Sequence, residues 1–353
     1  MAQAHDYNDG HSVSGYHGGS YHPGRVVVPT ALAEAQSLGQ SGQELLVSLV
    51  VGYDVATRVR GRKDRRPLSD AYASAAVSAR LRGFGNEEVG RSMGLAGFLA
   101  AGQQLPGRAD AYLRNGFRAR SGIDAALMVA EGFGAPAIVD DPELSTRFLR
   151  HGLGQQFEVM NVYIKPYPTC RMTHGPIEAA LELRTGINEP LQSVSSVEIL
   201  QLPRGMYVAR RRPDAKLSTV HAEFNLYYVV AVALIDGRVG LAQFRPARIR
   251  RSDVQTLSER ITVRPCKEFS TGYPGSSRAS SMTIVLGDGS VLNHRVDLPR
   301  GEGCTFMATD EVIGKFERNA RRAVDSARIP AIVDAVLGVE QCSDVQELIA
   351  LLM

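Results

Sequence analysis

Apolar residues recur every three or four positions through most of the first 160 residues, which is the spacing of one buried helical face. The segments with this pattern are residues 29–40, 41–60, 68–85, 86–102 and 120–136. Ser41 and Glu44 match an S-x-x-E capping box, which predicts a helix that begins beside them. Small residues are frequent in the third and fourth segments and let helix axes approach closely. Residues 1–160 are therefore predicted to be helical after an opening loop.

The pattern changes near residue 160, where short segments begin to alternate apolar and polar residues, as strands do. The alternating segments are residues 193–202, 259–267 and 281–297. The last of them contains the sequence Gly287-Asp288-Gly289, which is typical of a tight hairpin turn. From residue 309 onward the helical spacing returns. The sequence thus predicts a helical domain that an α+β module interrupts and that the C-terminal segment rejoins.

The chain has 353 residues, of which 44% are hydrophobic and 22% are charged, and this length is enough for two buried cores. Its 40 basic and 37 acidic residues leave a net charge of +3. So small an excess argues against a nucleic acid or an acidic membrane as partner. Basic residues do cluster at 58–66 and 209–216, and each run is either a solvated face or an anion-binding site.

The four cysteines lie far apart and form no C-x-x-C pair, so we expect free thiols in a reducing compartment and no thiolate metal site. The longest apolar runs, at residues 44–56 and 225–237, are shorter than the roughly 18 residues that a membrane span needs. The N-terminus lacks a basic stretch followed by an apolar one, which argues against a signal peptide. We therefore expect a cytoplasmic protein.

The opening segment is rich in glycine and in groups that bind protons or metals. The side chains concerned are those of Asp6, Asp9, His11, His17 and His22. Glycine lets a backbone approach a ligand closely. Histidine and aspartate ligate zinc and iron, but these spacings match no fixed metal motif, so we expect no metal. On composition alone, a disordered polar terminus is the alternative.

A second polar stretch, residues 161–184, combines basic groups with a rigid backbone. Prolines at positions 166 and 168 favour an extended chain, and a helix is predicted to begin near Pro176. The polar side chains before this helix are those of Lys165, Cys170, Arg171 and His174. Backbone amides and the dipole at a helix N-terminus favour an anion. Solvated charges with a capping histidine are the alternative.

A third stretch, residues 202–216, carries Arg204, Tyr207 and three consecutive arginines. Guanidinium groups bind carboxylates through paired hydrogen bonds, although surface solvation explains these arginines as well. Together the stretches suggest a pocket at a domain junction that removes a proton next to a carboxylate, because the enolate that develops needs cations around it. No phosphate-binding glycine loop follows a strand and no G-x-S-x-G occurs, which argues against nucleotide cofactors and serine hydrolysis.

Three motifs occur in a fixed order along the chain. They are the opening D-Y-N-D with a later His-Pro, K-P-Y-P-T-C-R-M-T-H at residues 165–174, and H-A-E-F-N-L-Y-Y-V-V-A-V-A-L-I-D-G at residues 221–237. These motifs resemble those of the MmgE/PrpD family, which includes 2-methylcitrate dehydratase, cis-aconitate decarboxylase and iminodisuccinate epimerase. The resemblance runs from residue 4 to about residue 325.

The resemblance implies a large all-helical domain with an inserted smaller α+β lid domain. With the changes of pattern, this assigns residues 1–160 and 308–353 to the helical domain and residues 161–307 to the lid. It also implies an active site between the two domains, no metal or organic cofactor, and a homodimer. The family has further helices upstream of its opening motif, so we expect a helical domain that is trimmed or that a partner subunit completes.

The resemblance further implies roles for individual residues. The catalytic residues that it implies are Asp6, Asp9, His22, Lys165 and Tyr207, and the substrate-binding residues are Arg66, Arg171, His174 and Arg204. His22 and Lys165 would exchange protons with the substrate, Tyr207 would assist, and the aspartates would orient His22. The other cationic side chains would orient the substrate as readily as react with it.

Two positions depart from the pattern of the family's decarboxylases. Arg66 stands at or near a family histidine, and Ala111 stands near a family lysine, with Arg108 and Arg114 close by in the sequence. A guanidinium stays charged, so Arg66 favours anion binding over proton exchange. The departures argue against simply copying the dehydratase or decarboxylase reaction.

The leading hypothesis is a cofactor-independent hydro-lyase that acts on a small di- or tricarboxylate. It would remove a proton alpha to a carboxylate and release water from the beta carbon. Epimerisation or decarboxylation through the same carbanion is the second hypothesis. A non-catalytic carboxylate-binding homologue is the third.

Overall fold

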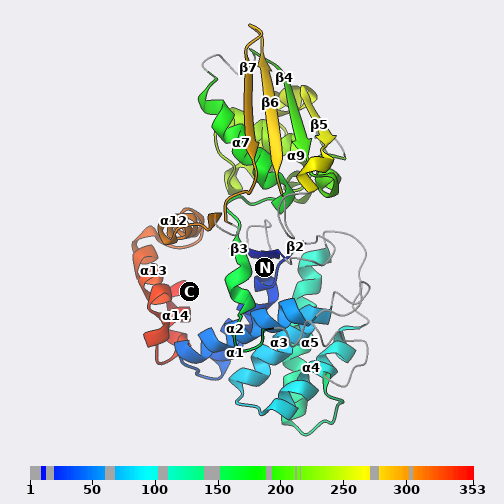
Figure 1. The fold of residues 1–353 in the computed structure, drawn as a ribbon. Helices are drawn as coiled ribbons and strands as arrows, with labels where there is room; N and C mark the ends of the chain where they lie inside the picture. The colour runs from blue at the N-terminus through cyan, green and yellow to red at the C-terminus, as the bar shows by residue number, and fades with distance from the viewer. Residues whose placement is uncertain are drawn as a thin grey trace.

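The computed structural model describes residues 9–12, 20–59, 68–101, 110–138, 152–187, 193–210, 213–214, 216–270, 278–301 and 305–353. In its N-terminal part, helices pack together in the lower half of the view in Figure 1. They are α1 (Gly24–Ser37), α2 (Gly42–Arg58), α3 (Leu68–Leu81), α4 (Asn86–Ala100) and α5 (Asp110–Ala130). The helical prediction for this part of the chain is therefore confirmed in the described segments.

Helix α3 lies at the centre of this group and contacts α1, α2, α4 and α5. Its buried alanines are Ala71, Ala73, Ala75, Ala76 and Ala79. Because an alanine side chain is a single carbon, the neighbouring helices approach the α3 backbone closely. Helix α2 begins after Ser41, whose side chain accepts a hydrogen bond of 3.3 Å from the backbone amide of Glu44, so the predicted start of the helix is confirmed. The Glu44 side chain pairs with Arg80 at 2.8 Å.

Helix α5 begins ten residues before the predicted segment at 120–136 and ends at Ala130. The sequence pattern does not predict the first ten residues of α5, because arginines interrupt the spacing of its apolar residues. Arg118 is buried on this helix and pairs with Asp70 of α3 at 3.0 Å. The spacing of apolar residues gives no sign of a buried face that carries a charged side chain.

The opening segment forms strands, which corrects the expectation of a loop that precedes any packed element. The strands of this sheet are β1 (Asp9–Ser12), β2 (Ser20–Tyr21) and β3 (Val162–Ile164), in the order β2-β1-β3 with antiparallel pairing. The register sets Asp9 opposite Ile164 and Gly10 opposite Tyr163. Because β3 lies far along the chain, nothing in the local pattern of the opening segment could reveal the pairing.

A second sheet forms the upper part of the molecule in Figure 1. Its region contains α7 (His174–Thr185), β4 (Val194–Gln201), α8 (Thr219–Ala222), α9 (Leu226–Asp236), α10 (Pro246–Ile249), α11 (Ser252–Glu259), β5 (Ile261–Pro265), β6 (Ser280–Leu286) and β7 (Val291–Val296). The strand order is β5-β4-β6-β7, with β4 and β5 parallel and the other pairs antiparallel. The predicted hairpin is confirmed, and Gly289 in its turn has a φ of 88° that favours glycine.

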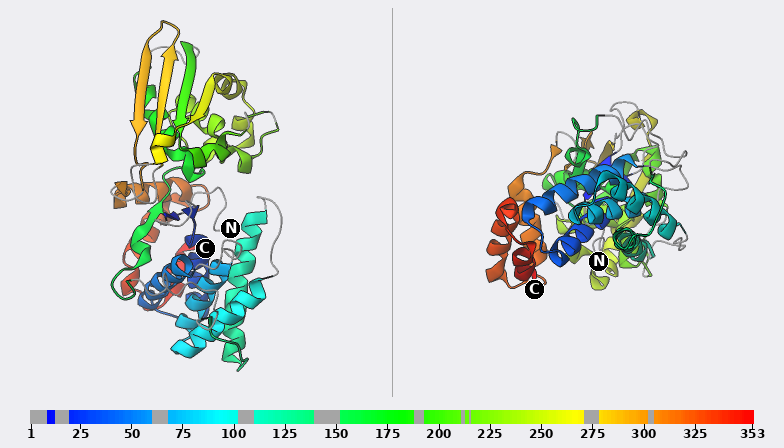
Figure 2. Two further views of the ribbon diagram at one scale, coloured as in Figure 1. Left: turned by 45° about the vertical axis from the view of Figure 1, so that its right-hand side comes forward. Right: turned by 90° about the horizontal axis from the view of Figure 1, so that it is seen from below.

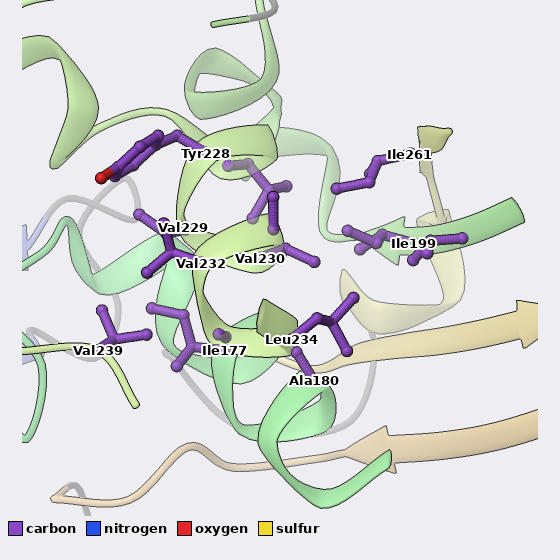
Figure 3. Packing of buried hydrophobic residues seen from close by; sticks show 14 of the residues in the cluster. Ile177, Ala180, Ile199, Tyr228, Val229, Val230, Val232, Leu234, Val239 and Ile261 are labelled. Carbon is purple, nitrogen blue, oxygen red and sulfur yellow. The ribbon is translucent and has the colours of Figure 1, made fainter. Parts of the chain in front are cut away.

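The core of this part lies between the sheet and the helices α7 and α9. Helix α9 is apolar on all sides, as expected of a helix that is buried all round. Figure 3 shows the α9 side chains with Ile177 of α7 on one side and Ile199 of β4 on the other. This packing explains why the apolar run at 225–237 is a core helix.

The C-terminal segment returns to the N-terminal helices. It forms α12 (Thr309–Ala320), α13 (Ile329–Leu337) and α14 (Val345–Leu352), and Figures 1 and 2 both show α13 and α14 beside α1 and α2. Val345 joins the core cluster that contains Val27 and Leu45. The backbone amide of Gly42 also donates a hydrogen bond of 2.9 Å to the carbonyl of Cys342.

The combination of a helical part with a smaller α+β part is confirmed by this architecture. The division at residues 160 and 308 and the description of the α+β part as a lid stay predictions. Of the cysteines, Cys170, Cys266 and Cys342 lie in the described segments and are free thiols. None of the helices in those segments combines the length and the apolar character needed to cross a membrane.

Candidate active site

Asp9 is the anchor of the candidate site. It lies on β1, and its Oδ2 atom accepts hydrogen bonds from the Tyr53 hydroxyl of α2 at 2.7 Å and from the Gly24 amide, at the start of α1, at 3.1 Å. Burial raises the pKa of the Asp9 carboxyl, although both of these hydrogen bonds oppose the shift. Its Oδ1 atom is buried and has no hydrogen-bond partner among the described residues. One oxygen is therefore saturated and the other is available to a ligand.

His22 is fixed by the backbone of the same strand. Its Nδ1 atom donates a hydrogen bond of 2.6 Å to the main-chain oxygen of Asp9. Because a carbonyl oxygen can only accept, Nδ1 carries the ring hydrogen, and in the neutral ring Nε2 holds the lone pair. His22 is half-buried and stands directly before Pro23 and α1. The ring is thus held in the tautomer that suits a base at Nε2.

Lys165 reaches the same region from β3. It is fully buried and follows Ile164, the residue that pairs with Asp9 across the sheet. Its positive charge acts on Asp9, where it lowers the carboxyl pKa against the larger effect of burial. The pairing of β1 with β3 therefore brings together two predicted catalytic residues that lie far apart in the sequence.

Arg171 and His174 lie side by side just before and at the start of α7, and both are buried. Arg171 donates hydrogen bonds of 2.7 and 2.9 Å to the carbonyls of Arg300 and Pro299, and one of 3.0 Å to Nδ1 of His174. Burial lowers the pKa of His174 well below its usual value, and the positive charge of Arg171 lowers it further. His174 is therefore neutral, and Arg171 ties the start of α7 to the segment after β7.

Tyr163 packs against two buried arginines. The guanidinium of Arg171 lies 4.7 Å from the centre of the Tyr163 ring, and that of Arg278 lies 5.3 Å from it. The Tyr163 hydroxyl is buried and has no hydrogen-bond partner within the described parts of the chain. Since Tyr163 lies opposite Gly10 on β1, this ring links the cations to the strand that carries Asp9.

Tyr207 and Arg204 lie on the short helix η6 (Pro203–Ala209) of the sheet-bearing part. The Tyr207 hydroxyl lies 3.0 Å from the sulfur of Cys170, in the K-P-Y-P-T-C motif. Tyr207 is half-buried and Arg204 is exposed. The thiol contact ties Tyr207 to the stretch that carries Lys165.

The remaining residues of the sequence prediction lie outside the described segments or on α5. Asp6, His17, Arg66 and Arg108 lie outside the described residues, and Ala111 lies on α5 with its side chain outside the description. Arg114 is half-buried on the same helix. Within the described segments, no three His, Cys, Asp or Glu side chains are grouped to hold a metal ion.

Two residues of this region were not predicted from the sequence. Tyr53 lies in an apolar helix and had no pattern to distinguish it from a core tyrosine. Lys315 of α12 is buried, and electrostatic interactions connect it with Asp9 and Lys165. A single lysine in an amphipathic helix gives no sign of burial in the sequence, so only the folded arrangement reveals it.

Comparison with known proteins covers nearly the whole chain. The model of the MmgE/PrpD N-terminal domain matches residues 1–152, and that of the MmgE/PrpD C-terminal domain matches residues 167–338. A cis-aconitate decarboxylase-like protein of Aspergillus oryzae is 26% identical over 400 residues, covering 99% of this chain and 80% of the relative. Cis-aconitate decarboxylase of Aspergillus terreus is 24% identical over 395 residues, covering 99% and 79%. An alkylcitrate dehydratase of a fungal species is 25% identical over 192 residues, covering 51% and 38%.

Proposed function

The chain belongs to the MmgE/PrpD family, and from this membership we propose that it is a lyase that acts on a small tricarboxylate through acid and base groups of the protein. The observation that carries the proposal is the hydrogen bond from His22 to the backbone of Asp9, a residue whose carboxyl group also interacts with the charge of the buried Lys165. A base next to a cation suits the removal of a proton alpha to a carboxylate, because the cation stabilises the negative charge that develops.

In the proposed reaction, Nε2 of His22 takes the proton from the carbon next to a carboxylate. The electrons of the broken carbon–hydrogen bond form a carbon–carbon double bond, and the hydroxyl group on the neighbouring carbon leaves. Lys165, as an ammonium ion, gives the proton that turns this group into water. Tyr207 assists at the leaving group, and the Asp9 backbone holds the base in position. The remaining predicted residues, Asp6 and Arg66 among them, complete the acidic pair and the carboxylate-binding set.

The buried cations support an anionic substrate. Arg171 and Arg278 both lie over the ring of Tyr163, and the buried Lys165 stands in the same motif as Arg171. The names of the relatives refer to cis-aconitate and to an alkylcitrate, which both carry three carboxylates. We propose that Arg171 and His174 orient this part of the site and that Arg204 approaches the substrate from η6.

Decarboxylation is the second candidate. It is favoured by the names of the relatives that match 99% of this chain, whereas the relative named as a dehydratase matches 51%. Both reactions need a proton to be exchanged with a carbon next to a carboxylate, so they share His22 as the acid or base. They differ in whether water or carbon dioxide leaves.

The proposal is tested by incubating the purified protein with citrate, 2-methylcitrate and cis-aconitate in heavy water and following the products by NMR. An alkene formed from a citrate supports dehydration, and released carbon dioxide with deuterium in the product supports decarboxylation. Deuterium exchange without an alkene would indicate epimerisation instead. If the protein binds these acids and converts none of them, the proposal of an enzyme is wrong.

We also propose that residues 161–307 act as a lid domain and that the protein is a homodimer. The chain crosses between its two parts near residues 162–166 and 297–301, and two connections allow one part to move against the other.

Phe98, Leu113 and Phe117 are exposed on α4 and α5, which supports a subunit contact there. Light scattering of the purified protein tests the dimer, since a monomer mass would contradict it.

A further inference from the structure

The second crossing between the two parts, at residues 299–301, belongs to no helix or strand. Its backbone polar groups therefore need partners from elsewhere in the fold. Both carboxylate oxygens of Glu178, on α7, accept a hydrogen bond from the backbone amide of Arg300, at 2.9 and 3.2 Å. Arg171 donates to the carbonyls of Pro299 and Arg300. Two side chains of opposite charge thus hold this crossing against α7 and the turn before it.

Gly301 packs against the backbone on both sides of Lys165. It is buried, and its φ of 91° favours glycine. A Cβ atom on Gly301 would collide with the carbonyl oxygen of Ile164 and would lie 3.5 Å from Cδ of Pro166. Figure 1 shows the chain run from β7 to α12 at the level of β3. The two crossings therefore meet at the residue that is the proposed proton donor.

We propose that Glu178 is a positioning residue for Lys165, because it fixes the Arg300 amide and with it the glycine that packs against the Lys165 backbone. This inference rests on the proposed function, in which Lys165 gives a proton to the leaving group. It deepens that function by assigning a role to a carboxylate that acts on the site through the second crossing. A displacement of a reacting group by about 1 Å can lower a rate about a hundredfold.

The hold on the Arg300 amide should depend on pH. Burial raises the pKa of Glu178 from 4.5 to about 7, while the hydrogen bond from the Arg300 amide and the charges of Arg171 and Arg300 oppose this shift. A carboxylate accepts a stronger hydrogen bond than a neutral acid does. The hydrogen bond should therefore strengthen as the pH rises through 7.

Other titratable groups lie near Glu178 or on the elements that contact α7. The side chain of Arg300 pairs with Glu311 of α12. Strand β6 carries no titratable group, whereas β7 and α9 carry His294, Arg295, Tyr227, Tyr228 and Asp236. Glu178→Gln leaves all of these groups in place and keeps an oxygen that accepts from the amide. This variant therefore removes the titration of Glu178 alone.

The first test follows hydrogen exchange of the Arg300 amide by mass spectrometry, with each rate divided by its intrinsic value at the same pH. At pH 8, the amide should exchange about ten- to a hundredfold faster in Glu178→Ala than in the wild type, the range for loss of a hydrogen bond to a charged group. Protection in the wild type should increase between pH 6 and pH 8, and protection in Glu178→Gln should stay constant. Equal protection in the wild type and in Glu178→Ala would overturn the inference.

The second test measures turnover of citrate, 2-methylcitrate or cis-aconitate, according to which of them the wild type converts. Glu178→Gln should match the wild type in kcat at pH 6 and fall about tenfold below it at pH 8, with a smaller change in KM. Titration of His22 is common to both proteins and cancels in this ratio. A purely structural role of Glu178 would change the free energy of unfolding without this pH-dependent loss of kcat.

Glu88→Gln is the matched control. Glu88 accepts a hydrogen bond of 2.8 Å from the Gly85 amide at the start of α4, so the change alters the same kind of contact outside the candidate site. This variant should keep the wild-type kcat at both pH values. If folded Glu178→Gln also keeps the wild-type kcat at pH 8, the inference is wrong and the proposed function stands. If the wild type converts none of the three acids, the proposed function and the positioning role both fail.

Discussion

The Nδ1 atom of His22 donates a hydrogen bond of 2.6 Å to the main-chain oxygen of Asp9 and not to its carboxylate. The carboxylate instead accepts hydrogen bonds from Tyr53 and Gly24. Asp9 therefore positions the histidine through its backbone, and through its side chain it ties β1 to α2 and to the start of α1. The orientation of the proposed base depends on how firmly β1 is held, and that dependence leads to testable predictions.

Replacing Gly10 by alanine should destabilise the protein. A Cβ atom at Gly10 would collide with the ring of Tyr163, which is fully buried and packs against the guanidinium groups of Arg171 and Arg278. Forcing an extra methyl group into a packed site costs about 1–3 kcal/mol. Urea denaturation of the wild type and of Gly10→Ala measures this difference.

Gly116→Ala is the matched control for that substitution. Gly116 lies inside α5, and a Cβ atom there meets no atom within 4 Å. Alanine should therefore stabilise this helix by roughly 0.5–1 kcal/mol. Equal stability of the Gly10 and Gly116 variants would contradict the close packing of β1 on Tyr163.

Tyr53→Phe should lower both stability and activity. The change removes the hydroxyl that donates to Asp9 at 2.7 Å and leaves a buried carboxylate with one donor fewer, at a cost of about 1–3 kcal/mol. If Asp9 moves as a result, His22 loses its orientation, and we expect turnover to fall roughly tenfold or more. Unfolding curves and initial rates measure the two effects separately.

Tyr228→Phe provides the comparison for Tyr53→Phe. Tyr228 is a buried tyrosine of α9 whose hydroxyl donates to the carbonyl of Gln243, within the sheet-bearing part. The two variants should lose similar stability, but only Tyr53→Phe should lose activity. Full activity in a folded Tyr53→Phe protein would mean that the Asp9 carboxylate serves the fold alone.

Glu158 should make the helical part sensitive to acid. The hydrogen bond from His11 at 2.9 Å lowers the pKa of Glu158 from 4.5 to about 2, against the opposing effect of burial. Since the pKa is lower in the folded state, this contribution is complete above about pH 4.5 and is lost as the pH falls toward 2. A shift of this size corresponds to about 3 kcal/mol, and because Glu158 is partly exposed and screened by solvent we expect a contribution of about 2 kcal/mol.

The measurement compares the wild type with Glu158→Gln, which keeps the shape of the side chain without its charge. Urea unfolding at pH 7 should show the wild type to be more stable, and the difference should shrink as the pH approaches 2. A difference that stays constant across this range would show that the His11 contact does not depend on the charge of Glu158. Because β1 carries both His11 and Asp9, loss of this contact should also lower activity at acid pH.

Elements with a continuous local pattern could be predicted from the sequence. Helix α9 follows from its apolar run and from Gly237 at its end, and the β6–β7 hairpin follows from its alternation and its turn residues. Such signals work because each element forms from residues that are close in the chain. The start of α5 could not be predicted, because its buried Arg118 pairs with Asp70, which lies on another helix.

The candidate site could be predicted only where a motif marked it. His22 and Lys165 stand in recognisable motifs, and the structure brings the segments that carry them together through the β1–β3 pairing. The pairing itself has no local signal, because its two strands are short and distant in sequence. Tyr53 and Lys315 sit in ordinary helical patterns, and their place in the site follows only from how the helices pack.

The central claim is that His22 exchanges a proton with a carbon of a tricarboxylate. The most direct measurement is the rate at which deuterium from heavy water enters carbon positions next to a carboxylate, with citrate or cis-aconitate as substrate. His22→Gln keeps a polar side chain in the same place but cannot act as the base. We expect this variant to fold normally and to lose about two to four orders of magnitude in rate. Exchange at the wild-type rate in a folded His22→Gln protein would contradict the account.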